Sequence, residues 1–152
     1  QVRVKRDECD VLHPMTTLAH HCNVDYGISK EDKGRYKPGW IEAGNASVAG
    51  NSPWAYRTMG RLDGAPITGR LTTYNGGGFA IDLFGSIQKI HVILDHLEDK
   101  QWLDKYTRAL FIEFGILNPN VNLFSRVCLF VEFSNTSNVS YFDTFNYSLL
   151  FD

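Results

Sequence analysis

The sequence predicts one domain of the α+β class, in which an antiparallel β-sheet packs against an amphipathic helix. The length of 152 residues suits a single domain. Hydrophobic residues make up 43% and charged residues 21%, a composition typical of a globular protein. The pattern changes near residue 70, from a loop-rich part over 1–69 to regular helix and strand patterns over 70–152.

The loop-rich part over 1–69 is dense in glycine and proline, which predicts short elements and long ordered loops. Trp40 and Trp54 are expected to pin these loops. Cys9 and Cys22 lie 13 positions apart in the same part. A disulfide between them would stabilise the fold by about 3 kcal/mol on the chain-entropy model. From the spacing alone, two free thiols are an equal alternative.

A glycine-rich run, Asn75–Gly78, separates two short strand candidates, Arg70–Tyr74 and Phe79–Leu83. Such a run between strands is typical of a hairpin turn. It lacks the Gly-Lys-Ser/Thr ending that binds phosphates, and a strand rather than a helix follows it. The sequence therefore predicts a hairpin here.

An amphipathic helix is predicted from Ser86, a candidate N-cap, to about Trp102. Its apolar residues recur at steps of three and four: Ile87, Ile90, Ile93, Leu94 and Leu97. Three strands should follow, over Thr107–Leu117, Asn122–Phe133 and Tyr141–Phe151. Because Thr107–Leu117 is apolar on both faces, we expect a central strand that is covered on both sides.

Sequons and cysteines indicate the compartment of the protein. Four Asn-x-Ser/Thr sequons occur, more than the composition predicts, at Asn45, Asn135, Asn138 and Asn146. They favour a glycosylated protein of the secretory pathway, and with it the Cys9–Cys22 disulfide. Cys128 lies in a strand-like run and is expected to be a buried, inert thiol. The longest charge-free run that is mainly apolar, over 114–125, contains proline and several asparagines, so it predicts no membrane helix.

The sequence predicts no enzyme, cofactor or metal site. Histidines at 13, 20 and 21 near the cysteines fit no recognised zinc spacing. Glu113 and Glu132, in adjacent predicted strands, could form an acid–base pair, but exposure or pairing with Arg108 and Arg126 is favoured. A net charge of −2 argues against general nucleic-acid binding. Because the chain begins at Gln1 without a leader, we expect it to be a piece of a larger protein.

Ordered segments along nearly the whole chain resemble the polycystin channel family. They are PWAY (53–56), YNGGGF (74–79) with DL (82–83), WLD (102–104), TRALFIEF (107–114), NPNVNLF (118–124) and LFVEF (129–133). The pair Cys9 and Cys22 resembles the cysteine pair near the start of the family's extracytosolic domain. Residues 22–40 and 52–54 are more similar to the polycystin-1-like branch than to polycystin-2. Ser125 stands where polycystin-2 carries a cysteine, and Cys128 lies three residues later.

The resemblance implies that residues 1–152 form the extracellular or lumenal polycystin (TOP) domain, between the first and second helices of a membrane-embedded channel unit. Such domains cover the pore and contact their neighbours in a tetrameric channel. The implied partners are polycystin-2-type subunits, and the implied role is assembly and gating of a calcium-permeable cation channel in the cell-surface or ciliary membrane. The same domain of a polycystin-2-type subunit and a secreted adhesion or lectin-like module are the alternatives.

Aromatic side chains are candidates for the contacts with partners. The candidates are Tyr36, Trp40, Trp54, Tyr56 and Phe79. The equal alternative is that those in the loops only pin their own loops. Glycans at the four sequons would mark surfaces that partners avoid.

Overall fold

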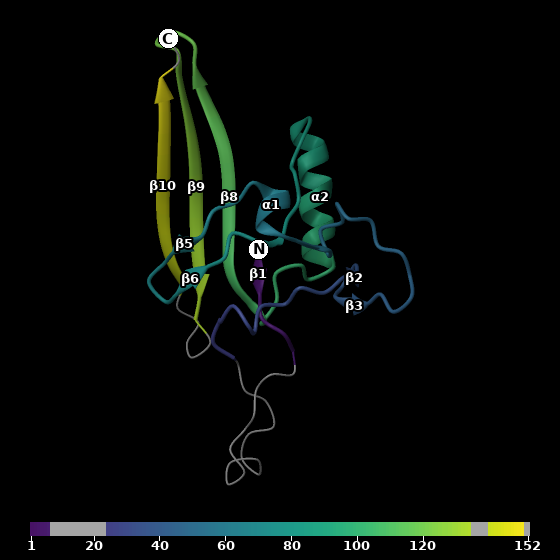
Figure 1. The fold of residues 1–152 in the computed structure, drawn as a ribbon. Coiled ribbons are helices and arrows are strands. Elements are labelled where there is room, and N and C mark those ends of the chain that lie inside the picture. The colour runs from purple at the N-terminus through teal and green to yellow at the C-terminus, as the bar shows by residue number, and fades with distance from the viewer. Residues whose placement is uncertain (7–23, 135–139, 151–152) are drawn as a thin grey trace.

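The computed structural model describes residues 1–6, 24–134 and 140–150 (Figure 1). Cys9, Cys22, Asn135 and Asn138 lie outside these ranges, so the disulfide and two of the four sequons stay predictions. The arrangement of helix and antiparallel strands in the described ranges is consistent with the predicted α+β class.

The main sheet contains four antiparallel strands within the described ranges, in the order β1-β8-β9-β10. They are β1 (Val2–Arg3), β8 (Thr107–Asn118), β9 (Leu123–Phe133) and β10 (Ser140–Leu150). β8 pairs with β9 from Ala109 to Asn118 without a register shift. The alternation of apolar residues predicted the three long strands to within one residue at each described end.

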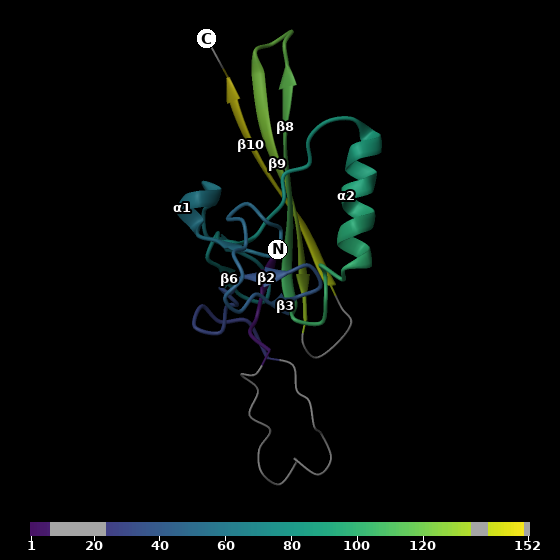
Figure 2. The same cartoon turned by 90° about the vertical axis from the view of Figure 1, so that its right-hand side faces the viewer.

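α2 (Ile87–Asp99) stands beside the sheet, and the figures show it on one side of β8 (Figures 1 and 2). The Ser86 hydroxyl accepts a hydrogen bond from the Lys89 N–H at 3.4 Å, which confirms the predicted N-cap. The helix ends before the predicted Trp102 because Gln101 adopts a left-handed backbone conformation, with φ 50°. The chain then turns and buries the Trp102 side chain.

Short elements fill the loop-rich part, as the density of glycine and proline predicts, and they continue to Phe79, past the change of pattern predicted near residue 70. Within the described ranges they are the pairs β2 (Tyr36–Lys37) with β3 (Ile41–Glu42), β4 (Tyr56–Arg57) with β7 (Gly78–Phe79) and β5 (Ile67–Thr68) with β6 (Thr73–Tyr74), and α1 (Met59–Leu62). None of the helices in the described ranges has the length and apolar character that crossing a bilayer requires.

The predicted hairpin around Asn75–Gly78 is wrong, because the strands on its two sides pair elsewhere. β6 pairs with β5, and β7 pairs with β4. Gly76 has a φ of +63°, and a Cβ there would lie 2.7 Å from the Ala65 carbonyl oxygen. Glycine at this position lets the run cross close to another backbone segment instead of closing a two-residue turn.

Two apolar clusters cover the two faces of β8 near its beginning. The first contains Trp40, Trp54, Phe79, Leu97 and Trp102, and the second contains Val2, Tyr74, Ala109 and Phe130. Leu110 packs against the first cluster and Phe111 against the second. From Ile112 onward β8 is exposed, so the prediction of a strand covered on both sides is wrong for its outer half.

Candidate subunit interface

α2 is fixed to the rest of the domain at its C-terminal end. Leu97 is buried in the first apolar cluster, whereas Ile87, ten residues earlier on the helix, is 66% exposed. Phe84, just before the helix, is 76% exposed. The N-terminal turns of α2 therefore present apolar side chains to solvent instead of to the core of the domain.

The outer half of β8 presents a second row of uncovered apolar side chains. Ile112, Phe114 and Ile116 alternate along the strand, and each is about half exposed. They share a face of the sheet with Leu110, which packs against the cluster that contains Leu97 of α2. The row therefore lies on the side of the sheet where α2 stands. Figure 2 shows the position of α2 relative to β8.

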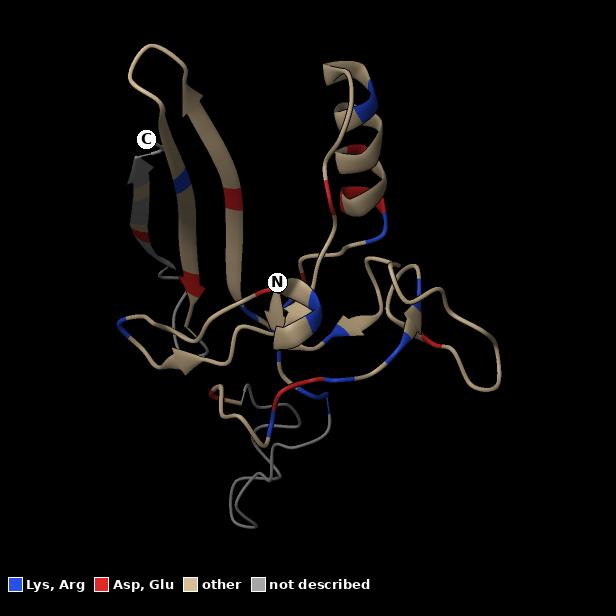
Figure 3. Ribbon diagram, turned by 45° about the horizontal axis from the view of Figure 1, so that its top comes forward, with Lys and Arg blue, Asp and Glu red and all other residues tan. Residues whose placement is uncertain are grey.

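We call these residues the α2–β8 apolar surface: Phe84, Ile87, Leu94, Ile112, Phe114 and Ile116. Figure 3 shows that the outer part of the β8–β9 hairpin carries few charged residues. The α2 residues and the β8 row lie on the same side of the sheet, and exposed apolar patches mark sites of interaction with other proteins. This surface is the best candidate for a subunit interface in the described part of the chain.

Tryptophan side chains hold the base of α2 below this surface. The Trp102 indole N–H donates to the Pro53 carbonyl oxygen at 2.9 Å, and the Trp40 indole N–H donates to the Gln101 carbonyl oxygen at 2.9 Å. The Trp54 ring meets the His96 ring edge to face, with 5.7 Å between the ring centroids. These contacts tie the end of the helix to loops that are distant in sequence.

The aromatic residues predicted as interface candidates do not form the exposed surface. Trp40, Trp54 and Phe79 are buried, and Tyr36 and Tyr56 pack against them half-buried. The expectation that they are exposed anchors is therefore corrected. The structure shows the alternative, in which these aromatic rings pin the loops by packing against each other, because their apolar area is larger than short loops can otherwise cover.

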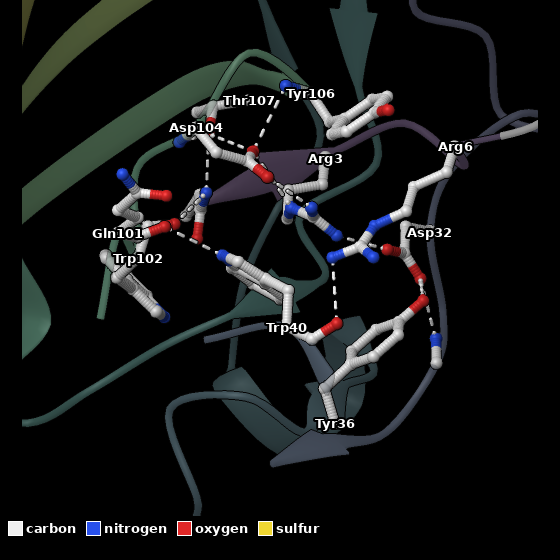
Figure 4. Close-up of polar contacts among 12 residues, drawn as sticks. Arg3, Arg6, Asp32, Tyr36, Trp40, Gln101, Trp102, Asp104, Tyr106 and Thr107 are labelled. Carbon is white, nitrogen blue, oxygen red and sulfur yellow. Dashed lines mark hydrogen bonds and ion pairs between the residues drawn. The ribbon is translucent and has the colours of Figure 1, made fainter. Parts of the chain in front are cut away.

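A buried arginine links the N-terminal strand to the loops beneath α2 (Figure 4). The Arg3 guanidinium contacts Asp32 at 2.5 Å and Asp104 at 2.6 Å, and it lies 3.6 Å from the centroid of the Trp40 ring. Asp32 also accepts a hydrogen bond from the Tyr36 hydroxyl at 2.8 Å. Burial, with this hydrogen bond second, raises the pKa of Tyr36 to about 12, so its hydroxyl stays a donor at pH values where an exposed tyrosine has lost its proton.

Sequence reasoning missed the Arg3 cluster as a unit and missed Phe84 as an exposed residue. Asp104 lies in the WLD segment, and Arg3 lies between two valines in a strand-like run. Because valines alternate with basic residues over Val2–Lys5, the pattern predicts an exposed face for Arg3 and gives no sign of its burial. The sequence held no signal that identifies Asp32 as the partner of Arg3.

The two glutamates weighed as an acid–base pair have separate partners. Glu113 forms an ion pair with Arg126, which confirms one of the favoured alternatives. Glu132 is buried and accepts hydrogen bonds from the Arg70 N–H at 2.7 Å and the Tyr74 hydroxyl at 3.1 Å, so the expectation of exposure or of pairing with Arg108 is wrong for this residue. Within the described ranges, no cluster of three or more His, Cys, Asp or Glu could hold a metal ion.

Cys128 is buried, as predicted, and burial raises the pKa of its thiol to about 11. The nearby Glu113 carboxylate raises this pKa further, because it opposes a second negative charge. We expect iodoacetamide at pH 8 to modify Cys128 at least about tenfold more slowly in the native chain than in urea, since the thiolate is the reactive form. Peptide mapping by mass spectrometry measures the two rates, and equal rates would contradict the prediction.

Two of the predicted glycosylation sites lie in the described ranges. Asn45 is exposed in a turn that is closed by a hydrogen bond from the Ala46 N–H to the Ala43 carbonyl oxygen. Asn146 lies within β10 and pairs with Val127, which itself pairs with Phe114. Modification of both asparagines stays a prediction.

Comparison with known proteins identifies the family. The model of the Polycystin domain family matches residues 1–143. Polycystin-1-like protein 3 from Mus musculus is 40% identical over 105 residues, which cover 69% of the chain and 5% of that protein. Polycystin-2-like protein 1 from Homo sapiens is 35% identical over 136 residues, which cover 90% of the chain and 16% of that protein. Polycystin-2 from Danio rerio is 33% identical over 136 residues, or 90% of the chain and 14% of that protein.

The chain thus spans only a small part of the length of these relatives, and both branches match. The family match covers nearly the whole chain and includes the segments that form β8, β9 and the loop after α2. The chain belongs to the polycystin domain family.

Proposed function

We propose that the chain is the extracellular or lumenal domain of a polycystin-1-like membrane protein. It assembles with polycystin-2-type channel subunits and regulates the gating of a calcium-permeable cation channel. The observation that carries this proposal is the α2–β8 apolar surface on a member of the polycystin domain family. In a tetrameric channel this surface contacts the polycystin domain of a neighbouring subunit.

The fold supports a mechanical role for this contact. The base of α2 is anchored through Leu97 and Trp102, whereas the turns near Ile87 are uncovered. A neighbouring subunit that binds these N-terminal turns can displace α2. Because the C-terminal end of α2 is anchored in the first apolar cluster, the displacement is transmitted to β8. Binding at the apolar surface is thereby coupled to the position of the sheet, which is the coupling that a gating domain needs.

The same domain in a polycystin-2-type subunit is the second candidate. The observation that favours it is the 35% identity to human polycystin-2-like protein 1 over 90% of the chain. The two candidates differ in the expected partner, because under the second candidate the neighbours in the tetramer are copies of this chain. The following experiment therefore includes both partners.

We expect chemical crosslinking to join this chain to the polycystin domain of zebrafish polycystin-2 when the two are secreted from the same cells. Phe84→Asp should lower the yield of the adduct by about tenfold, because a charge at this position must be desolvated in the contact. Ile28→Asp is the matched control, since Ile28 is 58% exposed but lies outside the α2–β8 apolar surface, and should leave the yield unchanged.

Each outcome of this experiment is informative. Adducts only between copies of this chain would favour the polycystin-2-type candidate. Failure to form any adduct, or equal loss with Phe84→Asp and Ile28→Asp, would contradict the proposed interface. Mass spectrometry of the crosslinked peptides identifies the residues in contact.

A further inference from the structure

β8 has a second backbone edge that is open along most of its length. β9 pairs with one edge from Ala109 to Asn118, whereas β1 reaches the other edge only at Thr107 and Ala109. Among the residues that the structure describes, no other segment forms a bridge or backbone hydrogen bond with β8 beyond Ala109. We propose that this open edge, Leu110–Asn118, binds one extended segment of a partner polypeptide by β-strand addition.

From Leu110 onward the open edge carries no lysine or proline, and the one irregularity in the pairing of β1 with β8 lies before it, between Val2 and Arg3. Exposed edges usually carry lysine, proline or a bulge that prevents pairing. The run LFIEFGILN contains neither lysine nor proline, and its register with β9 is regular. Its one charged residue, Glu113, is paired with Arg126 of β9. β10, at the other end of the sheet, instead carries the sequon at Asn146.

Apolar side chains are available to cover an added strand. Ile112, Phe114 and Ile116 form a half-exposed row on β8, and a strand next to β8 would extend this row. Phe84 and Ile87, on the α2 side of the same sheet face, are uncovered. The added segment would thus gain backbone hydrogen bonds from β8 and apolar contacts from α2.

The position of α2 favours a single segment over a second copy of the domain. Figures 1 and 2 show α2 beside the open edge of β8. A second copy would have to place its own sheet and helix along this edge, where α2 already stands. One extended segment requires only the width of one strand, about 4.8 Å.

β9 shows which partner chemistry suits β8. Its apolar residues alternate along the strand, and its basic Arg126 reaches Glu113. We therefore expect a partner segment without proline that is apolar at every second position. This inference goes beyond the proposed function because it concerns the backbone edge of β8 and holds for the chain without a channel. The added strand would share side chains of the α2–β8 apolar surface with the proposed subunit contact.

The test uses the chain 1–152 and a synthetic peptide with the sequence of residues 123–133, in which Cys128 is replaced by serine and both ends are blocked. We expect saturable binding by fluorescence anisotropy. Amide hydrogen exchange should slow at least tenfold at those N–H groups of 110–118 that face the open edge. Exchange in β10 serves as the internal control and should not change.

Two further peptides separate strand addition from apolar adhesion. Each is N-methylated at every second residue, one on the odd and one on the even positions. In an added strand, the N–H groups of every second residue donate to β8. N-methylation of those residues removes these donors, so one of the two peptides should lose binding and the other should retain it. Equal binding by both peptides, or no binding of the unmethylated peptide, would overturn the proposal.

Light scattering of the chain alone tests whether a second copy of the domain, instead of a single segment, occupies the open edge. A monomer over the range of concentrations used for the peptide is expected. A dimer that protects the amides of 110–118 would show that a second copy occupies the edge, and would overturn the single-segment proposal. Failure of the crosslinking with zebrafish polycystin-2 would leave these results unaffected, so the two proposals fail separately.

Discussion

Replacing Arg3 with methionine should lower the free energy of unfolding by about 3–5 kcal/mol, the cost of removing one partner from a buried ion pair. Arg3 is fully buried, and its guanidinium contacts Asp32 and Asp104. Methionine fills part of the space beside Trp40 but leaves the buried Asp32 carboxylate without its cation. The uncompensated negative charge, more than the lost packing, accounts for the size of the effect.

Urea unfolding followed by tryptophan fluorescence measures this change. Lys37→Met removes a charge from an exposed position and is the matched control, for which no measurable change is expected. The double substitution Arg3→Met with Asp32→Asn should be less destabilising than the sum of the single substitutions, because both members of the pair are then neutral. A loss below about 1 kcal/mol for Arg3→Met would contradict the role given to the buried cluster.

Local sequence patterns predicted the long elements because these elements are regular over many residues. The steps between Ile87 and Leu97 predict α2, and Ser86 supplies a cap that is local in sequence. The glycine-rich run Asn75–Gly78 misled the prediction because its partners, Ala65 and Gln1, are distant in sequence. Propensity indicates that a turn is possible but does not indicate which strands it joins.

The candidate interface could be predicted only in part, and the reason is physical. Apolar residues on both faces of β8 give the same sequence pattern whether the strand is covered by its own domain or is exposed until a partner binds. The sequence therefore predicted a covered strand, and the structure leaves Phe114 half exposed. Trp40 and Phe79 show the reverse error: they were predicted to be exposed and are buried. An aromatic residue among loops gives no local sign of whether it is buried.

Phe79→Ala should lower the free energy of unfolding by about 3–5 kcal/mol, whereas Phe84→Ala should change it by less than about 0.5 kcal/mol. Phe79 is fully buried, with its ring 4.9 Å from that of Trp40 and 6.0 Å from that of Tyr56. Removing this ring leaves a cavity in the first apolar cluster. Phe84 is 76% exposed, so its truncation removes little packing from the domain itself.

The same pair of variants separates folding from assembly. Phe84→Ala should be secreted like the unmodified chain and still form less adduct with zebrafish polycystin-2, because its ring belongs to the α2–β8 apolar surface. Phe79→Ala should be secreted poorly, and the folded fraction that remains should form the adduct normally, because Phe79 is buried and lies outside the α2–β8 apolar surface. Urea unfolding and crosslinking of equal amounts of folded protein measure both effects. A reversed result, with stable Phe79→Ala that no longer forms the adduct, would show that the loop aromatic residues form the interface after all.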